Sequence, residues 1–124
     1  MSFNLLIWIL ISVLLSAFSQ ILLKAGMVSP AVRKVLFTGY PLGIVIMIPS
    51  TPIIILGFLC FGLSLLIWLT ILSRIPLSTA YPFVALGIAV TVVAGVTLFG
   101  ETLSFQKVAG VILILVGILT VASA

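Results

Sequence analysis

The polar side chains of the first apolar stretch are spaced so that they fall on one side of a helix. In chain order they are Ser12, Ser16, Ser19, Gln20 and Lys24. Residues three, four or seven positions apart share one helical face. Hydroxyls alone often serve helix packing, because a serine in a membrane helix bonds a backbone carbonyl or a neighbouring helix. Gln20 and Lys24 cost more to bury, so we expect them to line a cavity that binds a polar or anionic group.

A second candidate face lies in the third apolar stretch and consists mainly of small side chains. Its members are Ala80, Val84, Gly87, Thr91 and Gly95. Small residues in a membrane helix either allow close packing or leave room for a ligand. Near its start, Pro82 removes a backbone hydrogen bond and can loosen the helix beside Tyr81. Such interruptions often adjoin transporter sites, although a proline is also tolerated in a first helical turn.

Glu101 is the only carboxylate in the chain. It precedes the last apolar stretch, where a negative charge is favoured by the helix N-terminus. We predict this structural role, with pairing to Lys107 or Lys24, and keep proton coupling as the alternative.

Groups suited to catalysis are scarce. The chain has no histidine, one acidic residue and one cysteine. Acid–base catalysis usually needs a histidine or a pair of acids with separated pKa values. Cys60 and Glu101 do not make a metal site, and no glycine-rich phosphate loop is present. We therefore predict no enzyme, no cofactor and no metal.

The elements that carry these residues are long enough to cross a membrane. The chain is 65% hydrophobic and 5% charged, with a mean hydropathy of +1.65, whereas soluble domains carry roughly a quarter charged residues. A crossing needs about 20 apolar residues. We predict an all-α, four-transmembrane-helix protein forming a single membrane domain over 1–124. The expected spans are about 3–24, 52–72, 77–99 and 103–122.

The stretch between the first two spans is the least regular. Arg33 and Lys34 precede an apolar piece, 35–48, that Gly39, Pro41 and Gly43 interrupt. It is too short and too broken for a span, so we predict a re-entrant or interfacial segment.

The basic residues are distributed unevenly across the predicted membrane. Lys24, Arg33, Lys34 and Lys107 fall on one side and Arg74 on the other. The positive-inside rule then places the first and third connections in the cytoplasm and both termini outside. These cations flank apolar runs and form no clustered basic face, so no nucleic-acid partner is expected.

Several motifs together resemble the drug/metabolite transporter superfamily, and more narrowly its four-helix members. They are Ser16…Gln20…Lys24, Trp68 eight residues before Pro76, the run from Ile75 to Pro82 with its Ala-Tyr-Pro, the turn Gly100-Glu101 and the pair Gly110…Gly117. The resemblance covers nearly the whole chain except 25–51. The substrate-headgroup residues that we assign with it are Ser16, Ser19, Gln20, Lys24, Trp68, Arg74, Tyr81 and Thr91.

Two branches of that superfamily compete. Small multidrug resistance exporters exchange protons for cationic drugs through a membrane-embedded glutamate, and Ser16 occupies that position here. The chain looks closer to the flippase subunits for undecaprenyl-phosphate-linked aminoarabinose, which also have serine there. That resemblance implies an inner-membrane flippase whose substrate is a polyprenyl phosphate carrying one sugar. A cation exporter is one alternative, and a non-transporting assembly subunit is the other.

A dimer is expected, because four helices of this length do not enclose a large headgroup alone. Gly110 and Gly117 lie seven residues apart among aliphatic residues, a spacing that keeps both on one seam. The charge bias argues against a dual-topology antiparallel pair. We predict a homodimer or a heterodimer with a related four-helix subunit, surrounded by membrane lipids.

Overall fold

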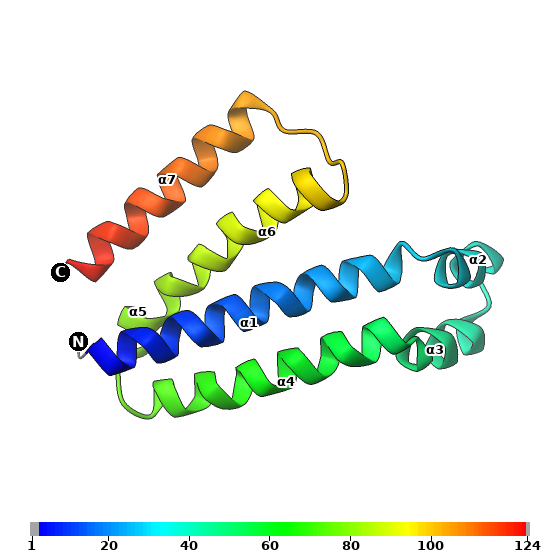
Figure 1. The fold of residues 1–124 in the computed structure, drawn as a ribbon, viewed down its shortest axis with the longest axis horizontal. Coiled ribbons are helices and arrows are strands. Elements are labelled where there is room, and N and C mark those ends of the chain that lie inside the picture. The colour runs from blue at the N-terminus through cyan, green and yellow to red at the C-terminus, as the bar shows by residue number, and fades with distance from the viewer. Residues whose placement is uncertain (1–2, 124) are drawn as a thin grey trace.

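The computed structural model describes residues 3–123, and nearly all of them are helical (Figure 1). In chain order the elements are α1 (Phe3–Met27), α2 (Pro30–Thr38), α3 (Pro41–Ser50), α4 (Pro52–Leu72), α5 (Leu77–Ala80), the 3₁₀ turn η1 (Tyr81–Phe83), α6 (Val84–Leu98) and α7 (Phe105–Ala122). No strand occurs in the described part of the chain. The predicted all-α class is confirmed.

Four stretches are long and apolar enough to cross a membrane. They are Phe3–Met27, Pro52–Leu72, Leu77–Leu98 and Phe105–Ala122. The shortest has 18 residues, which at 1.5 Å per residue spans about 27 Å of a hydrocarbon layer about 30 Å thick. Most large apolar side chains on these helices face outward, as expected where lipid replaces water. The protein is a multi-pass membrane protein, as predicted.

Helix α1 is the centre of the arrangement. It packs along α4 on one side and against α6 on another, while α7 packs on α6 and η1. The buried core joins Ile9 and Val13 of α1 to Ile71, Ala80, Phe83 and Ile118. This core lies toward the end that holds both termini, and Figure 1 shows α6 diverging from α1 toward the other end.

The two ends of the molecule differ in charge. The termini and the link from α4 to α5 lie at one end, and α2, α3 and the link from α6 to α7 lie toward the other (Figure 1). Arg74 belongs to the first end. The other four cations belong to the second and are Lys24, Arg33, Lys34 and Lys107.

Residues 30–50 form two short helices. Pro30, Pro41 and Pro52 each occupy the first turn of α2, α3 and α4, where the missing N–H of proline would have no helical partner anyway. Gly39 ends α2 with a φ of 66°, a left-handed conformation that glycine adopts without a Cβ clash. The sequence indicated an interrupted stretch, and two of its interruptions, Gly39 and Pro41, mark the boundary between α2 and α3, whereas Gly43 lies inside α3. Its depth in the membrane stays a prediction.

The third span is one crossing made of three pieces. Pro82 lacks the N–H that would bond the carbonyl four residues earlier, and the chain tightens there into the 3₁₀ turn η1. The helix is thus interrupted beside Tyr81, where the sequence indicated that proline would loosen it.

Candidate functional site

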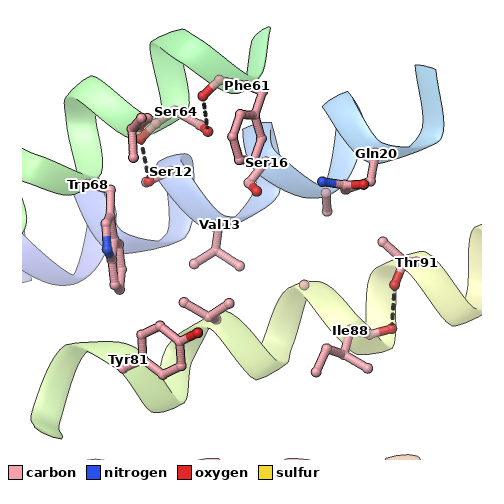
Figure 2. A pocket seen from close by; sticks show the side chains of 14 residues that line it. Ser12, Val13, Ser16, Gln20, Phe61, Ser64, Trp68, Tyr81, Ile88 and Thr91 are labelled. Carbon is pink, nitrogen blue, oxygen red and sulfur yellow. Dashed lines mark hydrogen bonds between the residues drawn. The ribbon is translucent and has the colours of Figure 1, made fainter. Parts of the chain in front are cut away.

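A cavity of about 370 Å³ lies between α1, α4 and α6. We call it the serine cavity. Figure 2 shows Trp68 and Tyr81 toward one end of it and Gln20 and Thr91 toward the other. Its polar lining consists of Ser12, Ser16, Gln20, Ser64, Trp68, Tyr81 and Thr91.

A second cavity of about 300 Å³ adjoins the first between α1 and α6. Gln20 and Thr91 line both cavities, while Lys24 and Glu101 line only the second. We call it the lysine cavity, and the two together the α1–α6 groove. The twelve-residue interval from Ser12 to Lys24 corresponds to about 18 Å along the helix axis. The groove therefore extends over a large part of a bilayer's thickness.

Not every hydroxyl in this groove is available to a ligand. The Ser12 hydroxyl donates to the backbone carbonyl of Ser64 across the buried α1–α4 contact at 2.9 Å. The Ser64 hydroxyl in turn donates to the Phe61 carbonyl at 2.7 Å. These two serines hold the wall of the cavity together, which is the helix-packing role that the sequence left open for serine.

Other polar groups in the groove have hydrogen-bonding capacity to spare. Within residues 3–123, neither the Ser16 hydroxyl nor the Gln20 amide forms a side-chain hydrogen bond. The Thr91 hydroxyl donates to the Ile88 carbonyl at 2.9 Å, which leaves its oxygen able to accept. A hydroxyl and an amide each offer donors and acceptors. The groove can therefore satisfy a ligand that carries several hydroxyl groups.

The aromatic end of the serine cavity is formed by Trp68 and Tyr81. Their ring centroids lie 6.5 Å apart with an interplanar angle of 66°, an edge-to-face geometry that aromatic pairs favour. Tyr81 is 61% exposed, so the pair lies at the mouth of the cavity. The 3₁₀ turn η1 fixes where Tyr81 stands relative to α4.

Two predicted headgroup residues lie outside the groove. Ser19 is fully buried against α4 next to Gly57, and its hydroxyl donates to the Ser16 carbonyl at 2.6 Å. A three-residue step rotates about 60° away from its starting point on a helix, which here is enough to turn Ser19 from the cavity to the helix contact. Arg74 lines a separate groove of about 240 Å³ with Trp8 and Thr70, at the end of the molecule that holds the termini.

The remaining predicted headgroup residues all lie along the groove: Ser16, Gln20, Lys24, Trp68, Tyr81 and Thr91. Ser64, the one hydroxyl near the middle of α4 in the cavity wall, was not predicted from the sequence. A polar side chain inside an otherwise apolar span was the signal that could have identified it.

Glu101 takes a different position from the one predicted. Helix α7 begins at Phe105 after Ser104, whose hydroxyl accepts the Lys107 N–H at 3.1 Å, so Ser104 is the N-cap. The Lys107 ammonium donates to the Thr102 carbonyl at 3.3 Å. Among the described residues Glu101 forms no ion pair with Lys24 or Lys107. Ser104 rather than Glu101 caps α7, because the link between α6 and α7 folds Glu101 back along α6. The structural role of Glu101 stays a prediction.

The turn that does this depends on two glycines. The Gly95 carbonyl accepts the N–H groups of Phe99 at 3.3 Å and of Glu101 at 3.1 Å. Gly100 has a φ of 64°, which reverses the chain. The Glu101 carboxylate then lies on the bare Cα of Gly95, where an added Cβ would stand 2.6 Å from one carboxylate oxygen. This places the carboxylate in the wall of the lysine cavity.

The comparison with known families agrees with this architecture. Residues 46–114 match the family described as Small Multidrug Resistance protein. The chain belongs to that family. The predicted resemblance to four-helix transporters is confirmed.

Relatives of this small multidrug resistance family member carry a more specific name. A probable 4-amino-4-deoxy-L-arabinose-phosphoundecaprenol flippase subunit ArnF from Proteus mirabilis is 35% identical over 90% of the chain and 86% of its own length. The ArnF subunit from Photorhabdus laumondii is 38% identical over 90% of the chain and 91% of its own length. A probable flippase subunit ArnE from Escherichia fergusonii is 35% identical over 55% of the chain and 61% of its own length. No solved structure matches the chain significantly.

The predicted seam of this family member is only partly covered by the fold: Gly117 is exposed, and Gly110 lines a cavity of about 250 Å³ with Val92 and Val96 of α6. A Cβ added to Gly110 or Gly117 would meet nothing within 4 Å. Large apolar side chains on the same helix, Leu113 and Leu119 among them, are also exposed. Neither glycine is therefore in close contact with another helix among the described residues.

Proposed function

We propose that this chain is one subunit of a flippase that moves a polyprenyl phosphate carrying a single sugar between the leaflets of the inner membrane. The α1–α6 groove carries the proposal, because it joins neutral hydrogen-bonding groups to a cation along one membrane-crossing helix. The names of the relatives support it, since they describe flippase subunits for an undecaprenyl-linked amino sugar.

The headgroup has two parts with different needs. A phosphodiester carries one negative charge, which Lys24 can neutralise through a charge-assisted hydrogen bond. The sugar hydroxyls find matching partners in Ser16, Gln20 and Thr91. Both interactions lower the cost of moving a polar headgroup through hydrocarbon. The polyprenyl tail never leaves the bilayer, so the groove has only the headgroup to accommodate.

The same groove is poorly suited to cationic drugs. An exporter of cations needs a carboxylate within its spans to compensate the charge of the cargo. Ser16 is neutral, and Glu101 lies in the link between α6 and α7 rather than in a span. The flippase is therefore the function we favour over a cation exporter or a non-transporting assembly subunit.

We further propose that the working unit is a dimer with a related four-helix subunit. The relatives include subunits of two kinds, ArnE and ArnF, and no side chain of another helix lies within 4 Å of the Cβ positions of Gly110 and Gly117 on α7. Both termini would lie outside the cytoplasm, with the four-cation end inside. Transport in this scheme involves no covalent chemistry, so the chain acts without catalytic residues.

Binding to the full-length chain in lipid nanodiscs tests the proposal. The probe is a farnesyl phosphodiester of a pentose, measured by native mass spectrometry and by titration. We expect Lys24→Met to weaken binding by at least about tenfold, because a charge-assisted hydrogen bond is lost. Lys34→Met is the matched control, since Lys34 is an exposed cation of α2 outside both cavities. Equal binding by both variants and the wild type would refute the assignment of Lys24.

A further inference from the structure

Two short helices connect the ends of α1 and α4 at one end of the molecule. Figure 1 shows α1 and α4 along their lengths, whereas α2 and α3 turn across this direction. A helix that lies across the end of a membrane-crossing helix has the orientation of an interfacial helix, whose axis follows the membrane surface. What such a helix binds depends on the face that it turns away from the protein.

Helix α2 has one face turned to the protein and an opposite face turned outward. Val32 is fully buried where α2 packs on α3 and the end of α1. Arg33, Lys34 and Phe37 are exposed. Phe37 follows Arg33 by four residues and Lys34 by three, so its ring and the two cations share one helical face. We call these three residues the α2 outer face.

The two cations of this face have no charge partner within the protein. Among residues 3–123 neither Arg33 nor Lys34 forms an ion pair or a side-chain hydrogen bond. No acidic residue occurs in α2 or α3. The only carboxylate side chain, that of Glu101, lies against Gly95 of α6. The α2 outer face therefore presents two uncompensated positive charges to its surroundings.

The same end of the molecule also exposes a large apolar surface. Phe37 is 90% exposed, and Tyr40 in the link to α3 is 64% exposed. Helix α3 has no buried residue, although most of its ten residues are apolar. Water would leave this surface without a partner, whereas aromatic rings at a membrane interface lie at the level of the headgroups beside hydrocarbon. Cations next to exposed apolar side chains therefore match a lipid surface better than an acidic protein segment.

We propose that the α2 outer face binds the headgroups of anionic phospholipids, with Phe37 inserted at the boundary between the headgroups and the acyl chains. Arg33 and Lys34 bind the lipid phosphates through charge-assisted hydrogen bonds. Zwitterionic phospholipids carry a phosphate too, but their own ammonium group offsets its charge, so the two cations favour anionic lipids. This inference concerns the lipids of the bilayer and does not rest on the proposed function.

A fluorescent reporter on this face tests the proposal. Phe37→Trp is prepared in the full chain, in phosphatidylcholine nanodiscs with a minor fraction of brominated phosphatidylglycerol or brominated phosphatidylcholine. Bromine quenches tryptophan at contact, and subtracting the signal of the wild type removes the contributions of Trp8 and Trp68. We expect phosphatidylglycerol to be enriched at the reporter by at least about fivefold, because each cation near the surface attracts anionic lipid. At about 1 M salt, where the Debye length is about 3 Å, the enrichment should be largely lost.

Charge variants in the reporter chain assign the preference to the two cations. Arg33→Gln combined with Lys34→Gln should make the two brominated lipids quench equally, whereas the charge-preserving pair Arg33→Lys and Lys34→Arg should keep the preference. Lys107→Gln is the matched control, because Lys107 is a cation outside α2 whose ammonium bonds the Thr102 carbonyl. It should keep the preference. Unfolding midpoints should be the same in all these variants, since the side chains that change are exposed.

Three outcomes would overturn the proposal. Equal quenching by both brominated lipids in the reporter chain would show that this face contacts lipid without selecting anionic headgroups. A preference that survives Arg33→Gln with Lys34→Gln would assign it to other cations. No quenching by either lipid would show that the face is covered by protein or lies in water.

This proposal and the proposed function fail separately. None of the three outcomes bears on binding of the sugar phosphodiester at Lys24. Bulk phospholipid is in excess at the α2 outer face in nanodiscs, so Lys34→Met remains the control for Lys24→Met.

Discussion

At the scale of single residues, the hydroxyls of α1 divide into structural groups and groups open to a ligand. Ser12 and Ser19 bond backbone carbonyls, at Ser64 and Ser16 respectively. The Ser16 hydroxyl faces the serine cavity without such a bond. Spacing along the helix placed all three on similar faces, and only the contact with α4 separates their roles.

This division predicts that one conservative substitution lowers stability and that the other weakens ligand binding. Ser12→Ala should lower the free energy of unfolding by about 1 kcal/mol, because it removes the hydrogen bond between α1 and α4. Ser16→Ala should leave the free energy of unfolding nearly unchanged and weaken binding of the pentosyl phosphodiester. Thermal unfolding in detergent and probe titration measure the two effects. A stability loss at Ser16 equal to that at Ser12 would contradict the division.

Because the Ser16 side chain is uncharged, it also affects whether the serine cavity accepts anionic or cationic ligands. In Ser16→Glu a carboxylate would enter the serine cavity, attract cations and repel the phosphodiester. We expect this variant to bind tetraphenylphosphonium, which the wild type should not bind, and to bind the phosphodiester at least about tenfold more weakly. Ser16→Gln controls for side-chain size and should bind no tetraphenylphosphonium. Tight binding of this cation by the wild type would favour the exporter interpretation.

At the scale of elements, the α1–α4 contact is the tightest packing in the fold. Gly57 of α4 lies against Leu23 and the Ser19 carbonyl of α1, and an added Cβ would stand 2.8 Å from the Leu23 side chain and 3.3 Å from that carbonyl. Gly26 of α1 packs similarly on Ile54 of α4. Small residues at such contacts let two helix backbones approach closely, and this approach forms the rigid wall of the groove.

Packing at this contact can be tested with two glycines of the same helix. Gly57→Ala should destabilise the protein by about 1–3 kcal/mol, because the new methyl group forces Leu23 to move beside a backbone carbonyl that does not yield easily. Gly62→Ala adds the same methyl group where nothing lies within 4 Å and should change stability far less. Unfolding midpoints in detergent compare the two variants. Equal midpoints would show that the α1–α4 contact tolerates wider spacing.

At the scale of the whole molecule, α7 is the least covered of the four membrane-crossing helices. Only Ile118 is buried among its residues, and 6% of its membrane-crossing window is buried, against 28% for α1. Helices in a bilayer associate through close packing of small residues rather than through the hydrophobic effect. The face of α7 that carries Gly110 and the exposed Gly117 is therefore the surface we expect a second subunit to contact.

Dimer formation should depend on this seam, whereas the stability of the single chain should not depend on it. Gly110→Leu and Gly117→Leu should abolish dimers in native mass spectrometry and cross-linking, because a large side chain separates the two helix backbones. Neither should lower the unfolding midpoint of the monomer much, since outside the local backbone of α7 nothing lies within 4 Å of either Cβ position, and Gly110 opens on a cavity of about 250 Å³ between α6 and α7. Gly62→Leu on α4 is the control outside the seam. Dimers that persist in both α7 variants would place the interface elsewhere.

The membrane-crossing helices and the polar face of α1 were determined by the sequence alone, because these features depend on residues close together in the chain. Apolar length specified four membrane-crossing helices, and four-residue spacing put Ser16, Gln20 and Lys24 on one face of α1. Prolines marked helix starts at positions 30, 41 and 52. In each case the cause is local, either hydropathy over one segment or the geometry of a single turn.

Only the tertiary structure decided which of these faces met and what each side chain then did. Ser19 turned to α4, Arg74 came to lie in a separate groove, and Glu101 folded onto Gly95 instead of capping α7. Each outcome depends on contacts between elements far apart in the chain, which helical periodicity does not encode. A helix face is a property of one segment, whereas a cavity exists only where several faces are packed against each other.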